Sequence, residues 1–212
     1  MSGPVIVIGS GGHARVLIDA LSLQTVEIFG ITDLKPEKAF KTVYGLPLIG
    51  KDDAIFEYKP DKVQLVNGLG SVRDTAARKK IYEYFKSRGY KFATIIHPSA
   101  VIASDVTIEE GSQIMAGSII QTGTCIGHNT IVNTKASVDH DCFIGPHVHL
   151  APGVTLSGGV EVGEGVHIGT GAAVIQGIRI GQNSIIGAGA VVVKDVPEGA
   201  IVTGVPARVV SP

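Results

Sequence analysis

The sequence predicts a small α/β domain followed by an all-β solenoid, a parallel β-helix built from six-residue repeats. Residues 1–97 alternate short apolar runs with amphipathic stretches, as strands and helices do in a parallel α/β domain. From residue 100 onward, an aliphatic side chain returns at every sixth position instead. The composition agrees, because 28 glycines and no tryptophan suit a chain that turns often around a narrow core.

The first 97 residues contain four strand-like and two helix-like stretches. Val5–Ile8 is wholly apolar, as expected of a strand that is buried on both faces. Apolar residues at helical spacing follow over 14–21. The other expected elements are strands at 26–31, 62–66 and 92–96 and a charged amphipathic helix at 74–87. This order predicts a small Rossmann-like α/β domain over 1–97.

The six-residue repeat runs without insertion from Ile102 to Val192, and each of its sixteen members is Ile, Val or Leu. The residue two positions earlier is small or β-branched, as Ser112 is. Such a period fits a three-sided prism in which both residues point inward and eighteen residues make one coil. Coils then stack at about 4.8 Å. Glycines that follow the aliphatic residue, such as Gly127 and Gly145, are expected at corners, where they permit positive φ.

Charge and composition exclude several classes of function. The formal net charge of -1 favours neither nucleic acid nor an anionic membrane as a partner. The apolar runs are too short to span a bilayer, and the first residues form a strand pattern, not a signal peptide. Two cysteines give no disulfide framework. We therefore expect a cytoplasmic protein.

His140 is the strongest candidate for acid–base chemistry. It follows Val138, an inward position, by two residues, so it lies at or near a corner between Asp139 and Asp141. A neighbouring carboxylate stabilises the imidazolium, and a histidine that titrates near neutral pH suits acyl transfer to an amine. A solvated polar turn with no catalytic role would show the same residues.

Two further histidines and the two cysteines have simpler interpretations. His149 and His167 are eighteen residues apart, so they should stack one coil apart and point away from the prism. No third ligand stands at a matching spacing, so we expect no metal. Cys142 occupies an inward position and should fill the core, whereas Cys125 lacks an activating base nearby in the sequence. Direct attack on a thioester is therefore simpler than an acyl-cysteine intermediate.

A glycine-rich loop follows the first strand. Gly9-Ser10-Gly11-Gly12 opens a helix, where backbone N–H groups can approach a phosphate, although a plain tight turn fits equally well. Asp33 stands about twenty residues on, where a ribose or base contact is expected, and Thr32 could take that role instead. The domain is small for a complete dinucleotide fold, so NAD chemistry is not expected.

Several motifs together resemble a known family. The uninterrupted hexapeptides and the ending at 193–197 and 204–207 are similar to those of the left-handed β-helix acyltransferases. Bacterial sugar acyltransferases of the PglD and NeuD type are resembled by Gly-Ser-Gly-Gly-His at 9–13, His-Pro-Ser-Ala at 97–100, and Asn-Thr at 133–134 before Val-Asp-His-Asp-Cys at 138–142. The resemblance implies the left-handed coil. It also implies a sugar-nucleotide-binding domain over 1–97 and an acetyl-CoA-binding catalytic domain over 98–212.

The resemblance also implies roles for individual residues. His140 would be the general base, supported by Asp141, where the family usually has glutamate. The residues implied to bind the substrate are Gly11, Gly12, His13, Asp33, Gly68 and Asn133, and those implied to bind acetyl-CoA are His149, Gly158, Thr170 and Ala188. His149 would hold the acetyl oxygen or the thioester. His167 has no implied role and is expected at the surface.

The expected function is acetyl transfer from acetyl-CoA to the 4-amino group of a nucleotide-linked 4-amino-4,6-dideoxy sugar. O-acetylation of a sugar such as sialic acid, with the same base, is the alternative, and a non-enzymatic β-helix is a more distant one. His140 and His149 are nine residues apart, which is half a coil, so they lie on opposite sides of one prism. If both act, each active site lies between two subunits, and three such sites close a homotrimer, as family members form.

Overall fold

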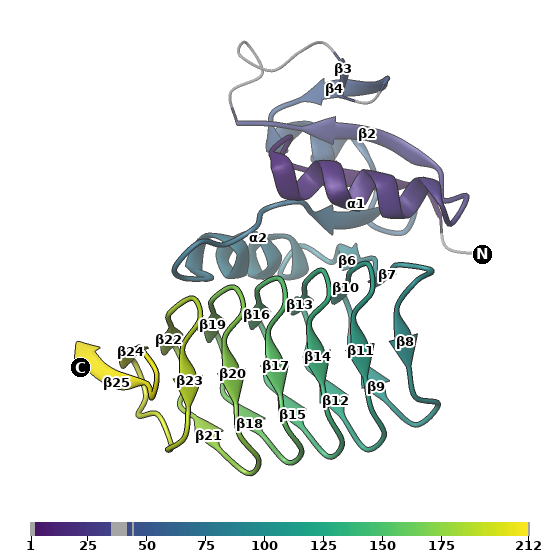
Figure 1. Ribbon diagram of the computed structural model, residues 1–212. Helices are drawn as coiled ribbons and strands as arrows, with labels where there is room; N and C mark the ends of the chain where they lie inside the picture. Colours follow the sequence, from purple (N-terminus) through teal and green to yellow (C-terminus); the bar gives the residue numbers. More distant parts are fainter. Residues whose placement is uncertain (1–2, 35–41, 44, 212) are drawn as a thin grey trace.

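The α/β region is built on one mixed sheet that helices flank (Figure 1). The computed structural model describes residues 3–34, 42–43 and 45–211. The sheet has the order β3-β4-β2-β1-β5-β6, and its pairs are parallel except β3 with β4. Its elements are β1 (Val5–Ile8), α1 (Gly12–Ser22), β2 (Ile28–Thr32), β3 (Thr42–Val43), β4 (Leu46–Gly50), the 3-10 helix η1 (Asp52–Glu57), β5 (Gln64–Asn67), α2 (Ala76–Lys86) and β6 (Lys91–Phe92).

The solenoid has three faces, each a parallel sheet in which successive coils pair eighteen residues apart, as Ile131 pairs with His149. The first face comprises β7 (Ile95–Ile96), β10 (Gln113–Ile114), β13 (Ile131–Val132), β16 (His149–Leu150), β19 (His167–Ile168), β22 (Ile185–Ile186) and β24 (Ile201–Thr203), with β25 (Arg208–Ser211) added antiparallel. The second face comprises β8 (Val101–Ile102), β11 (Ile119–Ile120), β14 (Ser137–Val138), β17 (Thr155–Leu156), β20 (Ala173–Val174) and β23 (Val191–Val192). The third face comprises β9 (Thr107–Ile108), β12 (Cys125–Ile126), β15 (Phe143–Ile144), β18 (Glu161–Val162) and β21 (Arg179–Ile180).

The repeated aliphatic residues form the solenoid core, as the period predicts. From Ile114 to Val192 they are buried, while Ile102 and Ile108 at the first coil pack against the core and stay partly exposed. The residues two positions earlier also point inward, and the hydroxyl of Ser112, for example, donates to the carbonyl of Gly127 at 2.9 Å. One hydrophobic column therefore runs the length of the coils.

The reason for glycine at the corners differs from the expectation. From Ile114 to Val192, positive φ falls three residues before each inward aliphatic residue, at Gly111, Asn129 and Asp141 among others, and not at the glycines that follow it. The prediction for Gly127 and Gly145 is therefore wrong. A Cβ at Gly127 would lie 2.6 Å from the backbone nitrogen of Pro146 on the next coil, so close stacking of the backbones requires glycine there.

The stretch at 92–96 is two strands, which corrects the prediction of one. Lys91–Phe92 pairs with β5 in the α/β sheet, whereas Ile95–Ile96 pairs with β10 on the first face. The chain thus passes from one sheet to the other within two residues, just before the predicted boundary at 97. The short β3, β4 and η1 were not predicted, because their sequence lacks a long apolar period.

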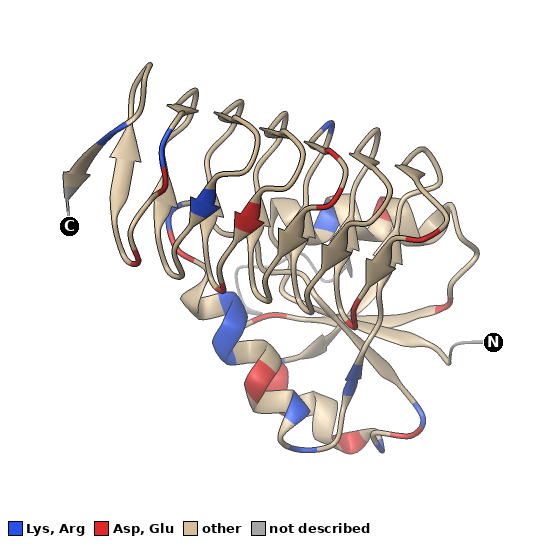
Figure 2. Ribbon diagram, turned by 90° about the horizontal axis from the view of Figure 1, so that it is seen from below, with Lys and Arg blue, Asp and Glu red and all other residues tan. Residues whose placement is uncertain are grey.

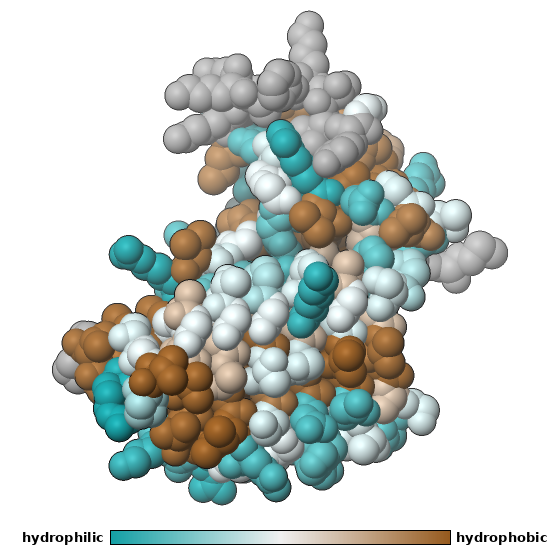
Figure 3. All heavy atoms as spheres, in the orientation of Figure 1, coloured by the Kyte–Doolittle hydropathy of each residue, from teal (hydrophilic) through white to brown (hydrophobic). Residues whose placement is uncertain are grey.

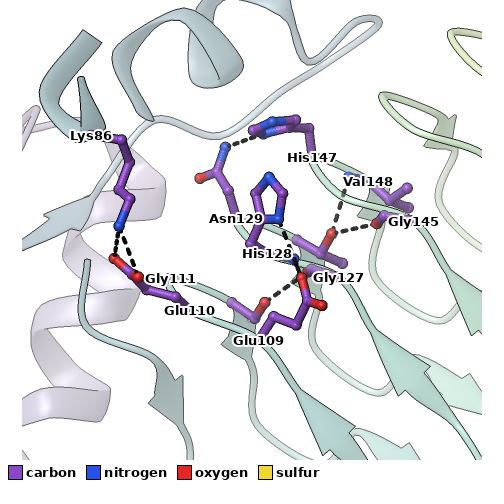
Figure 4. Close-up of polar contacts among 12 residues, drawn as sticks. Lys86, Glu109, Glu110, Gly111, Gly127, His128, Asn129, Gly145, His147 and Val148 are labelled. Carbon is purple, nitrogen blue, oxygen red and sulfur yellow. Dashed lines mark hydrogen bonds and ion pairs between the residues drawn. The ribbon is translucent and has the colours of Figure 1, made fainter. Parts of the chain in front are cut away.

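Helix α2 packs the α/β region onto the corner between the third and first faces (Figure 1). Lys86 Nζ lies 2.9 Å from both Glu110 carboxylate oxygens, and the ring of Tyr82 stacks on His128 with centroids 5.3 Å apart. Figure 4 shows how Asn129 Nδ2 donates to His147 Nδ1 at 2.8 Å in the same seam. Charged residues are frequent on α2 and sparse on the coils (Figure 2), and ion pairs such as Lys86 with Glu110 join the two regions along this seam.

Candidate active site

A cavity of about 860 Å³ lies between the α/β region and the first face of the solenoid. The loops after β1, β2 and β5 form one wall, and residues of coils β13, β16 and β19 form the other. Eight predicted site residues line it: Gly11, Gly12, His13, Asp33, Gly68, Asn133, His149 and Thr170. The structure therefore brings the predicted substrate residues together. The volume of the cavity is in the range of small-molecule binding sites.

The glycine loop leaves open space at the start of α1. Nothing lies within 4 Å of a Cβ built on Gly11 or Gly12, and the first turn of α1 has neither an acidic residue nor a side-chain cap. The positive end of the helix dipole thus faces the cavity, which suits a phosphate. Gly68 has a packing reason as well, because its Cβ would lie 2.5 Å from the carbonyl oxygen of Ile8.

Asp33, and not Thr32, faces the cavity at the end of β2. Its Oδ2 accepts hydrogen bonds from the backbone N–H of Ser10, at 3.2 Å, and from the Ser10 hydroxyl. Thr32 is fully buried and donates to Asp52 Oδ1 at 2.7 Å. Asp52, which was not predicted, also lines the cavity. Of the two residues, Asp33 is therefore the one placed to contact a ligand in the cavity, whereas Thr32 has a structural hydrogen bond to Asp52.

His13 connects the glycine loop to the solenoid. Its Nε2 lies 2.7 Å from Gln113 Oε1, an acceptor, so this nitrogen carries the proton. Gln113 Nε2 in turn donates to the carbonyl of Asn67 at 2.9 Å. Burial, with a smaller contribution from the charge of Arg78, lowers the pKa of His13 to about 4. His13 is thus a neutral hydrogen-bond donor at neutral pH, not a base.

Arg78 is fully buried beneath the cavity loops and was not predicted as a site residue. Its Nη1 donates to the carbonyls of Asn67 and Leu69, at 2.8 and 2.9 Å, and its Nε donates to the carbonyl of Asn129 at 3.2 Å. Burial lowers the pKa of Arg78 to about 9. One side chain of α2 therefore holds the loop after β5 to the solenoid.

His149 and His167 are paired on adjacent coils, as their spacing predicts, and their rings meet edge to face with centroids 5.1 Å apart. They point away from the prism, but the α/β region covers them, and only 5% and 6% of their surface is exposed. The expectation that His167 lies at the surface is therefore wrong. Burial, followed by the charges of His167, His13 and Arg78, lowers the pKa of His149 to about 2. His149 cannot act as a general base near neutral pH.

His140 lies in the corner between β14 and β15, and 49% of its side chain is exposed. Its Nδ1 lies 2.8 Å from Asp141 Oδ2, so the shorter carboxylate reaches the ring. The hydrogen bond to Asp141, followed by the charge of Asp139, raises the pKa of His140. Because a carboxylate only accepts, Nδ1 carries the proton and Nε2 keeps its lone pair. The geometry is that of a histidine that can take a proton.

Gly158 gives the His140 ring its space. A Cβ on Gly158 would lie 2.5 Å from both Cε1 and Nε2 of His140. Gly158 therefore lies beside His140, at the corner between the second and third faces. Thr170 and Ala188 follow β19 and β22 at the corner between the first and second faces, where Thr170 lines the cavity and Ala188, one coil further, does not. The residues expected to bind acetyl-CoA are thus divided between two sides of the prism.

His140 and the cavity lie on opposite sides of one solenoid. The corner that holds His140 joins the second and third faces, and in a three-sided prism that corner is opposite the first face, which carries His149. The half-coil spacing predicts this separation. Cys142 is buried in the core, where burial raises the pKa of its thiol, so it offers no nucleophile. Within the described parts of the chain, no three His, Cys, Asp or Glu side chains gather as a metal site.

Comparisons with known proteins identify the family. A model of the PglD N-terminal domain matches residues 4–85. A structure of perosamine N-acetyltransferase from Caulobacter crescentus, a histidine-to-asparagine mutant in complex with CoA and GDP-perosamine, is 38% identical. It covers 99% of this chain and 98% of that chain, with a TM-score of 0.92. The chain belongs to the PglD-type sugar N-acetyltransferases.

Two other relatives of this PglD-type chain agree. The acetyltransferase domain of PglB from Neisseria gonorrhoeae, in complex with acetyl coenzyme A, is 34% identical over 99% of this chain and 100% of that one, with a TM-score of 0.92. UDP-N-acetylbacillosamine N-acetyltransferase from Bacillus subtilis is 38% identical over 118 residues, so the match spans about half (51%) of that relative's length. The solenoid of the PglD-type chain is accordingly a left-handed β-helix, as the resemblance implies.

Proposed function

We propose that this chain transfers the acetyl group of acetyl-CoA to the 4-amino group of a nucleotide-linked 4-amino-4,6-dideoxy sugar. The end-to-end similarity to an N-acetyltransferase that was solved with CoA and GDP-perosamine carries the proposal. The cavity supports it, because a phosphate-ready helix start and Asp33 lie in the α/β region, while the coil residues His149 and Thr170 face them.

His140 is the proposed general base. Its Nε2 accepts a proton from the sugar amine as the nitrogen attacks the thioester carbonyl carbon. The new C–N bond forms, the C–S bond breaks, and the CoA thiolate leaves and can regain the proton from the imidazolium. Asp141 stabilises that imidazolium through its hydrogen bond to Nδ1, and Asp139 contributes charge. The chemistry uses no metal and no acyl-cysteine.

The proposed active site lies between two subunits of a homotrimer. His140, Asp141 and Gly158 from one solenoid meet the cavity with Asn133 and His149 of its neighbour, because one chain holds the two groups on opposite sides. Exposed apolar side chains on the second and third faces suit burial between solenoids, and the space-filling view shows hydrophobic patches on the coils (Figure 3). The exposed apolar side chains of these two faces include Val101, Ile119 and Phe143, which are 62%, 39% and 55% exposed.

The function is tested by incubating the protein with acetyl-CoA and UDP-, GDP- and dTDP-linked 4-amino sugars. We expect thiol release that depends on the amino sugar and an N-acetyl product identified by NMR. Thiol release with a hydroxyl acceptor alone would instead establish the O-acetylating alternative. No described helix is both long and apolar enough to cross a membrane. A cytoplasmic location stays a prediction.

A further inference from the structure

Residues 68–75, between β5 and α2, cross from the α/β region to the solenoid, and residues 68–72 of this segment line the cavity. Midway along it, the Oγ of Ser71 lies 2.5 Å from Nδ1 of His149 and 3.4 Å from Nδ1 of His167. Four residues on, Thr75 Oγ1 donates to the carbonyl of Gly165 at 3.1 Å. The loop that begins with Gly68, on the proposed nucleotide side, therefore reaches the paired histidines of the coils.

The hydrogen bonds around His149 determine where its proton lies. The backbone N–H of Thr134 donates to Asn133 Oδ1 at 2.8 Å, so the Asn133 amide turns its NH₂ group toward His149. Nδ2 of Asn133 lies 3.0 Å from Nε2 of His149 and donates to it. Nε2 is therefore the acceptor, Nδ1 carries the proton, and that proton goes to the Ser71 hydroxyl oxygen.

Both ring nitrogens of His149 have hydrogen-bond partners, so this ring has no free N–H for the acetyl oxygen or the thioester that it was expected to hold. Asn133 differs. One N–H of its NH₂ group points to His149, its Oδ1 is held by Thr134, and its second N–H has no partner among the described residues. Asn133 is partly exposed and lines the cavity, so this N–H is a donor available to a bound ligand.

We propose that Ser71 is a positioning residue: its hydroxyl accepts the Nδ1 proton of His149 and so holds the ring with its Nε2 toward the Asn133 amide in the cavity. This inference rests on the proposed acetyltransferase function. The burial of His149 supports it, because a neutral ring surrounded by other donors keeps one proton and one lone pair. The loop on the nucleotide side thereby sets a hydrogen-bond donor on the coil side before the ligands meet.

The tautomer is measured by NMR of protein with ¹⁵N-labelled histidine side chains, with the His149 signals assigned by their loss in His149→Gln. We expect a neutral ring with the proton on Nδ1 throughout pH 6–8. In Ser71→Ala, Nδ1 loses the hydroxyl oxygen and keeps only the backbone of residue 71 as a partner, so the ¹⁵N shifts of both ring nitrogens change. A wild-type ring protonated on Nε2, or unchanged His149 signals in Ser71→Ala, would overturn the inference.

Kinetics complete the test. Ser71→Ala should lower kcat about fivefold to tenfold, the usual effect of one hydrogen bond, and Ser71→Thr, which keeps the hydroxyl, should recover most of it. The matched control is Thr75→Val, which removes the other hydrogen bond from this segment to the coils without touching His149. An equal loss of kcat in Thr75→Val, with wild-type His149 signals, would show that anchoring the loop is what matters and would refute a role through His149.

The two proposals fail in different ways. A wild-type protein that acetylates no amino sugar refutes the proposed function whatever the state of His149. A wild-type protein that acetylates an amino sugar while Ser71→Ala keeps the same kcat refutes only the role of Ser71.

Discussion

At the scale of single residues, environment gives identical side chains opposite properties. The pKa of His140, beside Asp141, is raised, whereas burial lowers the pKa of His149 to about 2. The sequence could predict which histidine has carboxylate neighbours, because Asp139 and Asp141 are adjacent to it. It could not predict the burial of His149 and His167, because the α/β region covers them with segments distant in the chain, such as Ser71, which is 78 and 96 residues away.

Asp141→Asn tests the support of the base. Position 141 has φ +58°, which asparagine tolerates better than most residues. The base must be neutral to accept a proton, so activity falls as the pH drops through the pKa of His140. Asp141 raises that pKa, so its loss should move the acidic limb of kcat/KM to lower pH and reduce the plateau at least about tenfold.

Asp105 provides the matched control for that profile. It is a carboxylate in the same corner of the prism, thirty-six residues earlier, where it accepts from Thr122 and Gly123 and contacts no histidine. Asp105→Asn should leave the acidic limb in place. An unshifted limb in Asp141→Asn, or the same shift in Asp105→Asn, would count against the assigned pair.

Gly158→Ala tests the space beside His140. The added methyl lies 2.5 Å from the ring, which can rotate away, so the fold should survive while the ring leaves Asp141. We expect a melting temperature close to that of the wild type and a clear fall in kcat. Gly159→Ala is the opposite case, because nothing lies within 4 Å but φ is +65°. Gly159→Ala should therefore lower the melting temperature, because alanine is strained at this φ, and should change kcat little. Equal effects of both variants on kcat would contradict this account.

At the scale of elements, α2 shows how far a periodic pattern reaches. Its amphipathic spacing predicts the helix, and the buried face contains Tyr82 and Phe85. Arg78 stands four residues before Tyr82 on that same face, and an arginine at a core position is the signal that could have revealed its role. What it binds could not be predicted, because three carbonyls from distant segments meet there only after folding.

Arg78→Met should destabilise the protein by roughly 3 kcal/mol or more, because the carbonyls of Leu69 and Asn129 lose this donor and that of Asn67 keeps only Gln113 Nε2. The nucleotide-side loop should loosen as well, which raises KM for the nucleotide sugar. The control is Arg88→Met just beyond the same helix, where the guanidinium lies 3.6 Å from the centroid of the Tyr84 ring at the surface. Chemical denaturation measures the free energy of unfolding of both variants. Equally small decreases in the two would show that the buried arginine is dispensable.

The seam beneath α2 should weaken in acid. The Asn129 amide donates to His147 Nδ1, and burial lowers the pKa of His147 to about 4. As the pH falls, His147 is therefore protonated in the unfolded chain before it is protonated in the folded one. The contribution of neutral His147 to folding stability is present above pH 6.5 and is lost as the pH falls toward 4. Between pH 7 and 5 the loss is about 2 kcal/mol for this one residue.

His147→Asn isolates that contribution, because asparagine accepts the positive φ of +59° but does not titrate. Denaturant unfolding at pH 7 and pH 5 should show a smaller pH-dependent loss for the variant than for the wild type. The same loss in both proteins would place the acid sensitivity elsewhere.

At the scale of the whole molecule, the sequence predicted the solenoid better than the α/β region. A side chain that returns every six residues fixes the coil, its core and the stacking of positions eighteen apart, since each depends only on local spacing. The cavity depends on which face the α/β region covers, and that is decided by long-range contacts such as His13 with Gln113, one hundred residues apart. The separation of His140 from the cavity needs only the half-coil spacing, and it makes the subunit interface the central claim.

Mixing two inactive variants tests that claim most directly. His140→Ala removes the proposed base and Asn133→Ala removes a residue of the cavity, so each homogeneous protein should lose most of its activity. Equal amounts refolded together should recover about one quarter of the wild-type activity, because a random trimer places two intact halves at one interface in four. Mixed protein that stays as inactive as its parents would mean that one chain supplies both halves, and the two-subunit site would be wrong.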